Sequence, residues 1–439
     1  MLRDKQQLVR LFPYVCAVIW LILVTGLISY RLILPLGRYA PQTSPLQDYM
    51  LALSFCVLSC GVILFLKGIG QDRPLFMACW LIKCILVTVV MLYYEYHYKL
   101  LDAFRFFDAT PIIDKPRFGN GTYNMKVFSS VLSYLGIPYF RTQMVVFSWF
   151  GFLGIYFFYL SLRTYSSSIA RYFILGACLY PSMLFWSSIF GKDPLILFFL
   201  GLTFLNWSLL YKKAKTRNNP IWILLTLFSL IPASALLLIR PWMFSIYSLS
   251  VTIFVFVYIS CKIFDGKFAL PIFGVTVLTA LLGALQFPSL WMGRIDKLIK
   301  HSQDWSRGGS AQLITQNLQD PVELIDFALL AQFTSLFRPI GNEFPGMFSF
   351  VVGVENILVL SLFVFAIIAI SIARRSHRGL PAFHFGYLLT WSAVYGFVSY
   401  QNLGSAARFR LQACCSLLII ICFGIYRLKQ ELERQKEKP

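Results

Sequence analysis

Long runs of apolar residues, interrupted by few charges, recur along the whole chain. Each run has roughly the 20 residues that a helix needs to cross the hydrocarbon core of a bilayer. We count about twelve such runs, near residues 11–30, 49–68, 74–94, 143–162, 170–189, 193–211, 220–239, 242–261, 268–288, 351–372, 382–399 and 409–427. The gap at 190–193 is so short that a re-entrant hairpin is an alternative to two full spans there. The pattern predicts an all-α fold, a polytopic transmembrane helix bundle.

The composition also favours a membrane protein. Of the 439 residues, 58% are hydrophobic and only 13% are charged, and the mean hydropathy is +0.68. Soluble globular chains carry roughly 25% charged residues, so soluble enzymes, nucleic-acid-binding proteins and disulfide scaffolds are excluded together. All ten cysteines lie within or at the edges of predicted spans. This placement favours buried thiols over a disulfide framework or a metal site.

The net charge of +20 has a topological explanation. Basic clusters occupy every second connection between spans, from Arg3 and Lys5 through residues 212–217 to the tail. Because cytoplasmic loops are enriched in Lys and Arg, both termini are expected to be cytoplasmic. The charge therefore requires no nucleic acid, although it attracts anionic headgroups. We expect one transmembrane domain, residues 1–428, that retains its first apolar run and ends in a cytoplasmic basic tail, residues 429–439.

Two long external loops, about 95–142 and 289–350, are expected to carry amphipathic helices, one of them at 321–337. In the first loop, Asp102 and Asp108 stand in an aromatic stretch that would lie on the membrane surface. A carboxylate at that depth is costly unless it is solvated or used. A solvated helix face that pairs with Lys99 or Arg105 is the alternative to a catalytic role.

A charged pair, Lys192 and Asp193, stands in the short gap between two predicted spans. Asp193 precedes Pro194, and an acid before a proline at the first helical position is good capping chemistry. Capping explains Asp193 but not Lys192. The sequence thus marks Lys192 as a candidate binding residue at the external boundary.

Several short motifs together resemble a known family. They lie at residues 102–106 (Asp-Ala-x-x-aromatic), 181–193 (Pro-x-x-x-Phe-Trp-Ser-Ser…Lys-Asp), 239–241 (Ile-Arg-Pro), 308–310 (Gly-Gly-Ser), 336–343 (Leu-Phe-Arg-Pro…Glu), 355 (Glu) and 402–410 (Asn-x-Gly…Arg-x-Arg). With these motifs the chain resembles bacterial members of the GT-C glycosyltransferase superfamily, of the exopolysaccharide and O-antigen type. In the better-known members the acidic loop follows the first span, whereas two extra spans precede it here.

The resemblance implies a function and a set of roles. The function is transfer of a sugar from a polyprenyl-phosphate-linked donor to a glycan or lipid acceptor, on the external face of a bacterial inner membrane. An inverting transfer needs a carboxylate base, for which Asp102 and Asp108 are the candidates, and cations that hold the departing phosphate. The candidate residues for binding substrate and phosphate are Lys192, Asp193, Arg240, Arg338, Glu343 and Arg408. No metal site and no required cofactor are predicted, although a divalent cation between Asp108 and Asp193 is conceivable.

Two other functions remain open. O-antigen polymerases and ligases are multi-span proteins of similar size that use Arg and His in a late external loop, and Arg294, His301, Arg307 and Arg338 would supply such a set. A lipid or solute transporter is the third alternative. Against it, the chain has no matching pair of spans broken by Gly or Pro in its two halves.

Overall fold

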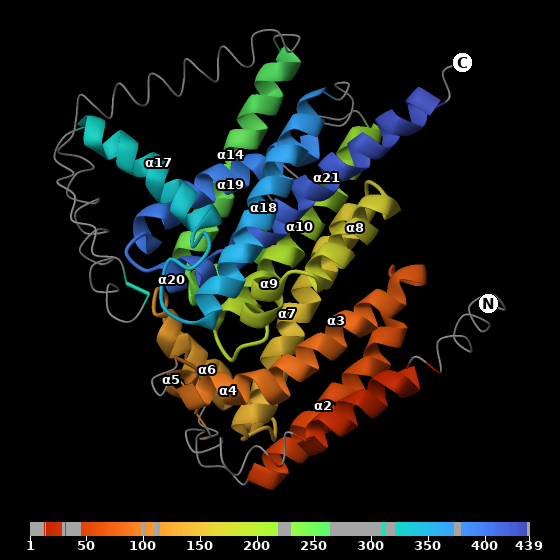
Figure 1. Cartoon of the computed structure of the whole chain (residues 1–439), viewed down its shortest axis with the longest axis vertical. Coiled ribbons are helices and arrows are strands. Elements are labelled where there is room, and N and C mark those ends of the chain that lie inside the picture. The colour runs from red at the N-terminus through yellow and green to blue at the C-terminus, as the bar shows by residue number, and fades with distance from the viewer. Residues whose placement is uncertain are drawn as a thin grey trace. The chain divides into compact units, whose positions relative to one another are not determined.

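The computed structural model describes residues 13, 15–28, 31, 45–97, 102–108, 110, 115–217, 230–263, 310–311, 321–372 and 379–436 (Figure 1). In these residues the regular structure is helical, apart from one isolated bridge between Ala311 and Asn402. The chain divides into two compact units, Met1–Phe244 and Ser245–Pro439, which we call unit 1 and unit 2. The single domain expected from the sequence stays a prediction.

Six helices in the described residues are long and apolar enough to cross a membrane. They are Leu46–Phe65, Gly70–Tyr96, Phe140–Arg163, Lys192–Leu210, Met347–Ser371 and Leu411–Lys436. Each matches one of the predicted spans, so the prediction of an integral membrane protein built from helices is confirmed. The number twelve and the two external loops are not confirmed. The predicted spans at 11–30, 220–239 and 242–261 correspond to the shorter apolar helices Val15–Ile28, Leu230–Ile239 and Pro241–Phe256. The span at 382–399 corresponds to the helix Gly379–Ser399, which is not one of the six. The span at 268–288 lies outside the described residues.

Two long helices of unit 1, Phe140–Arg163 (α7) and Lys192–Arg217 (α10), run parallel to each other and pack closely. The helices of unit 1 are α2 (Pro45–Phe65), α3 (Arg73–Ile85), the π-helical turn η3 (Leu86–Val90), α4 (Met91–His97), α5 (Asp102–Phe106), α6 (Gly121–Tyr134), α7 (Phe140–Arg163), α8 (Ser167–Cys178), α9 (Pro181–Trp186), α10 (Lys192–Arg217), α12 (Leu230–Ser234) and α13 (Leu236–Ile239). A Cβ atom on Gly154 of α7 would lie 2.7 Å from the carbonyl of Leu197 in α10, and Ser161 donates a hydrogen bond to the Phe204 carbonyl at 3.3 Å. Small residues allow this close approach of two membrane helices.

The predicted span at 170–189 is not one helix. It is divided between α8, which ends at Cys178, and α9, which begins at Pro181. Proline has no N–H for the helical ladder and restricts the residue before it to extended backbone, and Tyr180 has φ −106° and ψ 91°. The prediction of a continuous span is therefore wrong here, because a run of apolar residues does not reveal how a proline divides it.

Unit 2 contains α17 (Pro321–Phe337), α18 (Met347–Ile372), α19 (Gly379–Ser399), α20 (Leu403–Phe409) and α21 (Leu411–Lys436), and α14 (Pro241–Ile263) crosses the boundary between the units. The most apolar stretch of α21 is 78% buried, whereas that of α18 is 33% buried. The α18 helix carries a row of exposed large apolar side chains, as expected of a helix that faces lipid.

The helix predicted at 321–337 is confirmed. Its Leu329 side chain is 64% exposed, whereas Phe327 and Ala331 are buried against Tyr400. The helix is apolar over most of its surface, so the pattern alone could not identify the face that packs.

Candidate functional site

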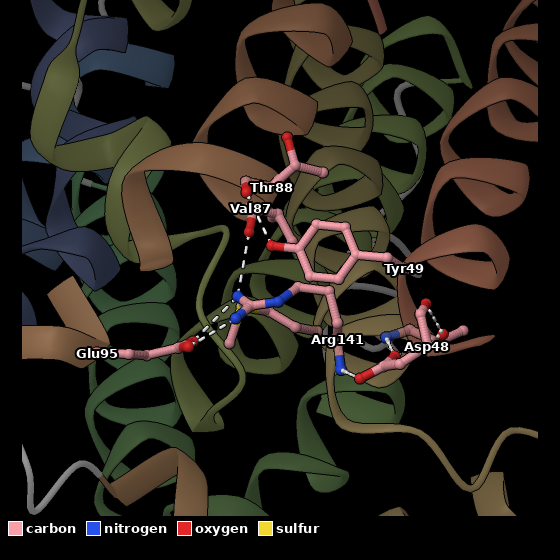
Figure 2. Close-up of polar contacts among 8 residues, drawn as sticks. Asp48, Tyr49, Val87, Thr88, Glu95 and Arg141 are labelled. Carbon is pink, nitrogen blue, oxygen red and sulfur yellow. Dashed lines mark hydrogen bonds and ion pairs between the residues drawn. The ribbon is translucent and has the colours of Figure 1, made fainter. Parts of the chain in front are cut away.

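A buried polar cluster centred on an ion pair joins three helices of unit 1 (Figure 2). The Arg141 guanidinium of α7 donates to both carboxylate oxygens of Glu95 in α4, at 3.0 and 2.6 Å, and the two side chains are only 2% and 1% exposed. Asp48 of α2 accepts hydrogen bonds from the backbone N–H groups of Arg141 and Thr142, each at 2.8 Å. Asp48 thereby caps the first turn of α7 from another helix, where a negative charge is favourable.

The π-helical turn η3 supplies further acceptors to this cluster. In a π-turn the hydrogen-bond spacing changes, which frees backbone carbonyls, and such turns are frequent at functional sites. The Val87 carbonyl accepts from Arg141 at 3.2 Å, and the Thr88 carbonyl accepts from the Tyr49 hydroxyl at 3.0 Å (Figure 2). The cluster is closed to solvent and its charged groups are paired, although Arg141 Nε has no acceptor among the described residues, so its role is structural. It fixes the ends of three helices relative to one another.

The sequence predictions missed this cluster. Asp48 and Arg141 are not among the candidates that the sequence predicts, and Glu95 stands there only as the first residue of the loop after the third predicted span. The available signal is a charge near the end of each of three apolar runs, because charges at membrane depth are rare and usually paired. Which charge pairs with which is decided only in the folded protein.

The two predicted carboxylates have different surroundings. Asp102 is exposed and begins α5. Asp108 is half-buried, and its Oδ1 accepts hydrogen bonds from the Thr110 N–H at 2.9 Å and from the Thr110 hydroxyl. The Asp108 backbone is bound to α6, since its N–H donates to the Ser129 hydroxyl at 2.9 Å and its carbonyl accepts from the Ser133 hydroxyl at 2.9 Å. Asp108 therefore closes a turn and anchors the segment that follows α5.

Gln143 of α7 holds the two serines in place. Its side chain is fully buried. Its Oε1 accepts from the Ser129 hydroxyl at 2.7 Å, and its Nε2 donates to the Ser129 carbonyl and the Ser133 hydroxyl, both at 3.1 Å. A chain of hydrogen bonds thus runs from α7 through α6 to Asp108. Figure 1 shows α5 and α6 side by side, at one end of unit 1.

The Lys192 side chain lies at the same end of unit 1 as α5 and α6. Its ammonium donates to the Thr122 hydroxyl at 3.1 Å and lies 5.5 Å from the centre of the Phe106 ring. Asp102 and Phe106 are four residues apart on α5 and so share one face of that helix. The structure therefore brings Lys192 to Phe106, the residue of α5 that lies one turn after Asp102. The neighbouring Asp193 is fully buried in the first turn of α10.

Arg240 comes directly after Ile239, whose backbone carbonyl contacts Gly121 at the start of α6. A Cβ atom on Gly121 would lie 2.0 Å from the Ile239 carbonyl oxygen and 3.4 Å from Lys192 Nζ. Only glycine tolerates such an approach, so Gly121 permits the start of α6, the end of α13 and Lys192 to meet. Arg240 directly follows this junction and is half-buried.

The other predicted residues belong to unit 2. The Arg338 Nε donates to both oxygens of Glu343 at 3.1 Å, and these side chains are 20% and 26% exposed. Arg410, buried between α20 and α21, donates to the Ser335 carbonyl at 3.0 Å and also to the Arg338 carbonyl and the Asn356 side chain. Arg410 thus fixes the backbone that carries Arg338 and acts as a scaffold.

Arg408 lies in the last turn of α20 and is half-buried. The side chain of Asn402 caps the start of this helix by accepting from the Ser405 N–H at 2.9 Å. Three residues of the alternative Arg and His set, Arg294, His301 and Arg307, lie outside the described residues. In the part of the chain that the structure describes, no three His, Cys, Asp or Glu side chains form a group that would hold a metal ion.

Comparison of the chain with protein families, curated proteins and solved structures finds no match. The resemblance to the GT-C superfamily therefore stays a prediction from short motifs.

Proposed function

We propose that the protein transfers a sugar from a polyprenyl-phosphate-linked donor to a glycan or lipid acceptor on the external face of a bacterial inner membrane. One observation carries the proposal. Asp102 shares a face of α5 with Phe106, and the Lys192 ammonium lies 5.5 Å from the centre of that ring. Sugar transfer from a lipid phosphate needs these two groups near each other, a carboxylate to take the proton of the acceptor hydroxyl and a cation to stabilise the departing phosphate.

The alternation of basic connections along the chain supports the external placement. The α7 helix runs antiparallel to Gly70–Tyr96, because Arg141 near its start contacts Glu95 while Tyr159 near its end donates to Asp72 at 2.8 Å. Arg73, Arg163 and Arg171 lie at the Asp72 end and belong to the connections that the sequence predicts to be cytoplasmic. Exposed cations also lie on or beside α5 and α6, among them Arg105, Lys115, Arg117 and Lys126, so the external placement of Asp102 and Lys192 depends on the alternation along the sequence.

The contacts favour Asp102 over Asp108 as the base. Thr110 donates two hydrogen bonds to Asp108, and Ser129 and Ser133 bind its backbone, so Asp108 acts as an anchor. Asp102 is exposed on the face that Lys192 approaches. Lys192 is the proposed phosphate ligand of unit 1.

Within unit 2, Arg338 is proposed by itself as a phosphate contact. Glu343 orients its guanidinium, and Arg410 holds its backbone. A guanidinium offers two parallel N–H donors to a phosphate, which an ammonium cannot.

The test uses the full chain in nanodiscs with radiolabelled polyprenyl-phosphate-linked hexoses, and thin-layer chromatography follows release of polyprenyl phosphate. We expect Asp102→Asn to slow release by about 10²- to 10⁴-fold, the usual contribution of a general base. Asp108→Asn is the matched control, because the amide oxygen still accepts from the Thr110 N–H, and it should stay within a few-fold of wild type. Full release by both variants would refute a carboxylate mechanism. If release then depends on Arg294, His301 and Arg307, the polymerase or ligase alternative replaces this proposal.

A further inference from the structure

Lys83 is a buried cation that the proposed chemistry does not use. It is fully buried and lies at the centre of Gly70–Tyr96, a helix of 27 residues. Its ammonium donates to the Ser187 carbonyl at 2.9 Å, the Ser187 hydroxyl at 2.7 Å and the Ser188 hydroxyl at 2.9 Å. Both hydroxyls give their own hydrogens to the Leu184 carbonyl, at 3.3 and 2.7 Å, so they accept from the lysine. Three acceptors match the three N–H donors of a protonated lysine.

The residues that Lys83 holds lie deep in unit 1. A Cβ atom on Gly151, the twelfth of the 24 residues of α7, would lie 2.1 Å from the Ser187 carbonyl oxygen. The Phe190 ring contacts the Phe147 ring, with centroids 4.5 Å apart. At a rise of about 1.5 Å per residue, Phe147 lies about 10 Å inside the start of α7 at Phe140. The chain therefore turns between α9 and α10 well before it reaches the level of Phe140, at the start of α7.

This turn consists of non-helical backbone at membrane depth. Residues 187–191, between α9 and α10, are all buried. Irregular backbone in the hydrocarbon region is tolerated only where protein or a water-filled cavity surrounds it. A cation in the middle of a span is costly and is retained mainly where it has a role. The serine contacts give Lys83 such a role, because they fix the start of the turn four residues before Lys192.

We infer that the α9–α10 connection is a re-entrant hairpin, and that Lys83 is a positioning residue that sets the depth of Lys192. This inference deepens the proposed function and depends on it for the role of Lys192 as a phosphate ligand. Lys192 then meets a phosphate below the level of the lipid headgroups. The substrate class that fits is a lipid-linked sugar phosphate that enters from the bilayer, and a soluble nucleotide sugar does not fit.

The first test does not depend on any activity. The protein in nanodiscs is treated with a membrane-impermeant amine reagent, and peptide mass spectrometry measures the modification of Lys192. Lys83→Met should raise the labelling rate of Lys192 by about tenfold, because the loss of its three hydrogen bonds frees the hairpin. Lys67→Met, which removes an exposed lysine, is the matched control and should change nothing. If Lys83→Met does not fold, Ser188→Ala, which removes one acceptor, should give a smaller rise. An unchanged rate in a folded variant overturns the inference.

The second test measures binding of polyprenyl monophosphate by native mass spectrometry. Lys192→Met and Lys83→Met should each weaken binding by about 10- to 100-fold, the range for a lost hydrogen bond to a charged group. The double variant should bind no more weakly than the worse single variant, because Lys83 acts through Lys192. Additive losses overturn the positioning role. If wild type binds no polyprenyl phosphate, the proposed function fails, and the labelling result still decides whether Lys83 holds the hairpin.

Discussion

Removing one charge of the Arg141 and Glu95 ion pair should destabilise unit 1 strongly, whereas removing both should cost much less. Arg141→Met deletes the two contacts to Glu95 and the hydrogen bond to the Val87 carbonyl. The cap that Asp48 provides survives, because it uses the backbone N–H of residue 141. The substitution therefore isolates the guanidinium.

The magnitude follows from burial. After Arg141→Met, the Glu95 carboxylate is 1% exposed and has lost both guanidinium donors. Breaking a buried ion pair by removing one partner costs about 3 to 5 kcal/mol, whereas replacing both partners by apolar residues of similar volume is close to neutral. We therefore expect each single variant, Arg141→Met or Glu95→Met, to lose about 3 to 5 kcal/mol, and the double variant to lose about 0 to 2 kcal/mol.

The assay is unfolding by sodium dodecyl sulfate in mixed micelles, followed by circular dichroism, for wild type and the three variants. Arg171→Met is the matched control, because Arg171 makes an ion pair with Asp72 at 2.7 Å but its side chain is 48% exposed. Exposed pairs contribute about 0 to 1 kcal/mol. The reasoning is refuted if the double variant loses the sum of the single losses, or if the single variants unfold like the Arg171 control.

Three further predictions use the same unfolding assay. Arg410→Lys should lose about 2 to 4 kcal/mol, because a lysine cannot serve the Ser335 carbonyl, the Arg338 carbonyl and the Asn356 amide together, and an unchanged midpoint would contradict the scaffold role. Gly154→Ala should lose about 1 to 3 kcal/mol through overlap with the Leu197 backbone, whereas Gly61→Ala in open space should gain up to about 1 kcal/mol, and equal effects would argue against close helix packing. Gln143→Leu should lose about 1 to 3 kcal/mol for each polar group left unpaired, and wild-type stability would show that the serine contacts are dispensable.

The helices were the most predictable part of this protein. A run of about 20 apolar residues is sufficient reason for a membrane helix, because the bilayer requires every backbone polar group to be bonded within the segment. The same criterion failed at 170–189, where Pro181 and the turn after Trp186 divide the run. The composition of a segment shows how apolar the segment is, but it does not show where the backbone stops being helical.

The candidate site was predictable only as separate residues. Asp102 and Lys192 were recognisable because a carboxylate or an ammonium beside apolar runs is unusual. Lys192 lies close to Phe106 of α5 and to Gly121, and Gly121 also contacts the Ile239 carbonyl more than a hundred residues along the chain.

The order of apolar and charged residues was enough to establish an integral membrane protein made of helices, because transfer of each segment into a bilayer depends on its own composition. The tertiary structure alone established that Arg141 pairs with Glu95 and that Lys83 binds Ser187 and Ser188. These partners are 46 to 105 positions apart in sequence. Hydrogen bonds and ion pairs act over a few ångströms, so they exist only once packing has brought their groups together.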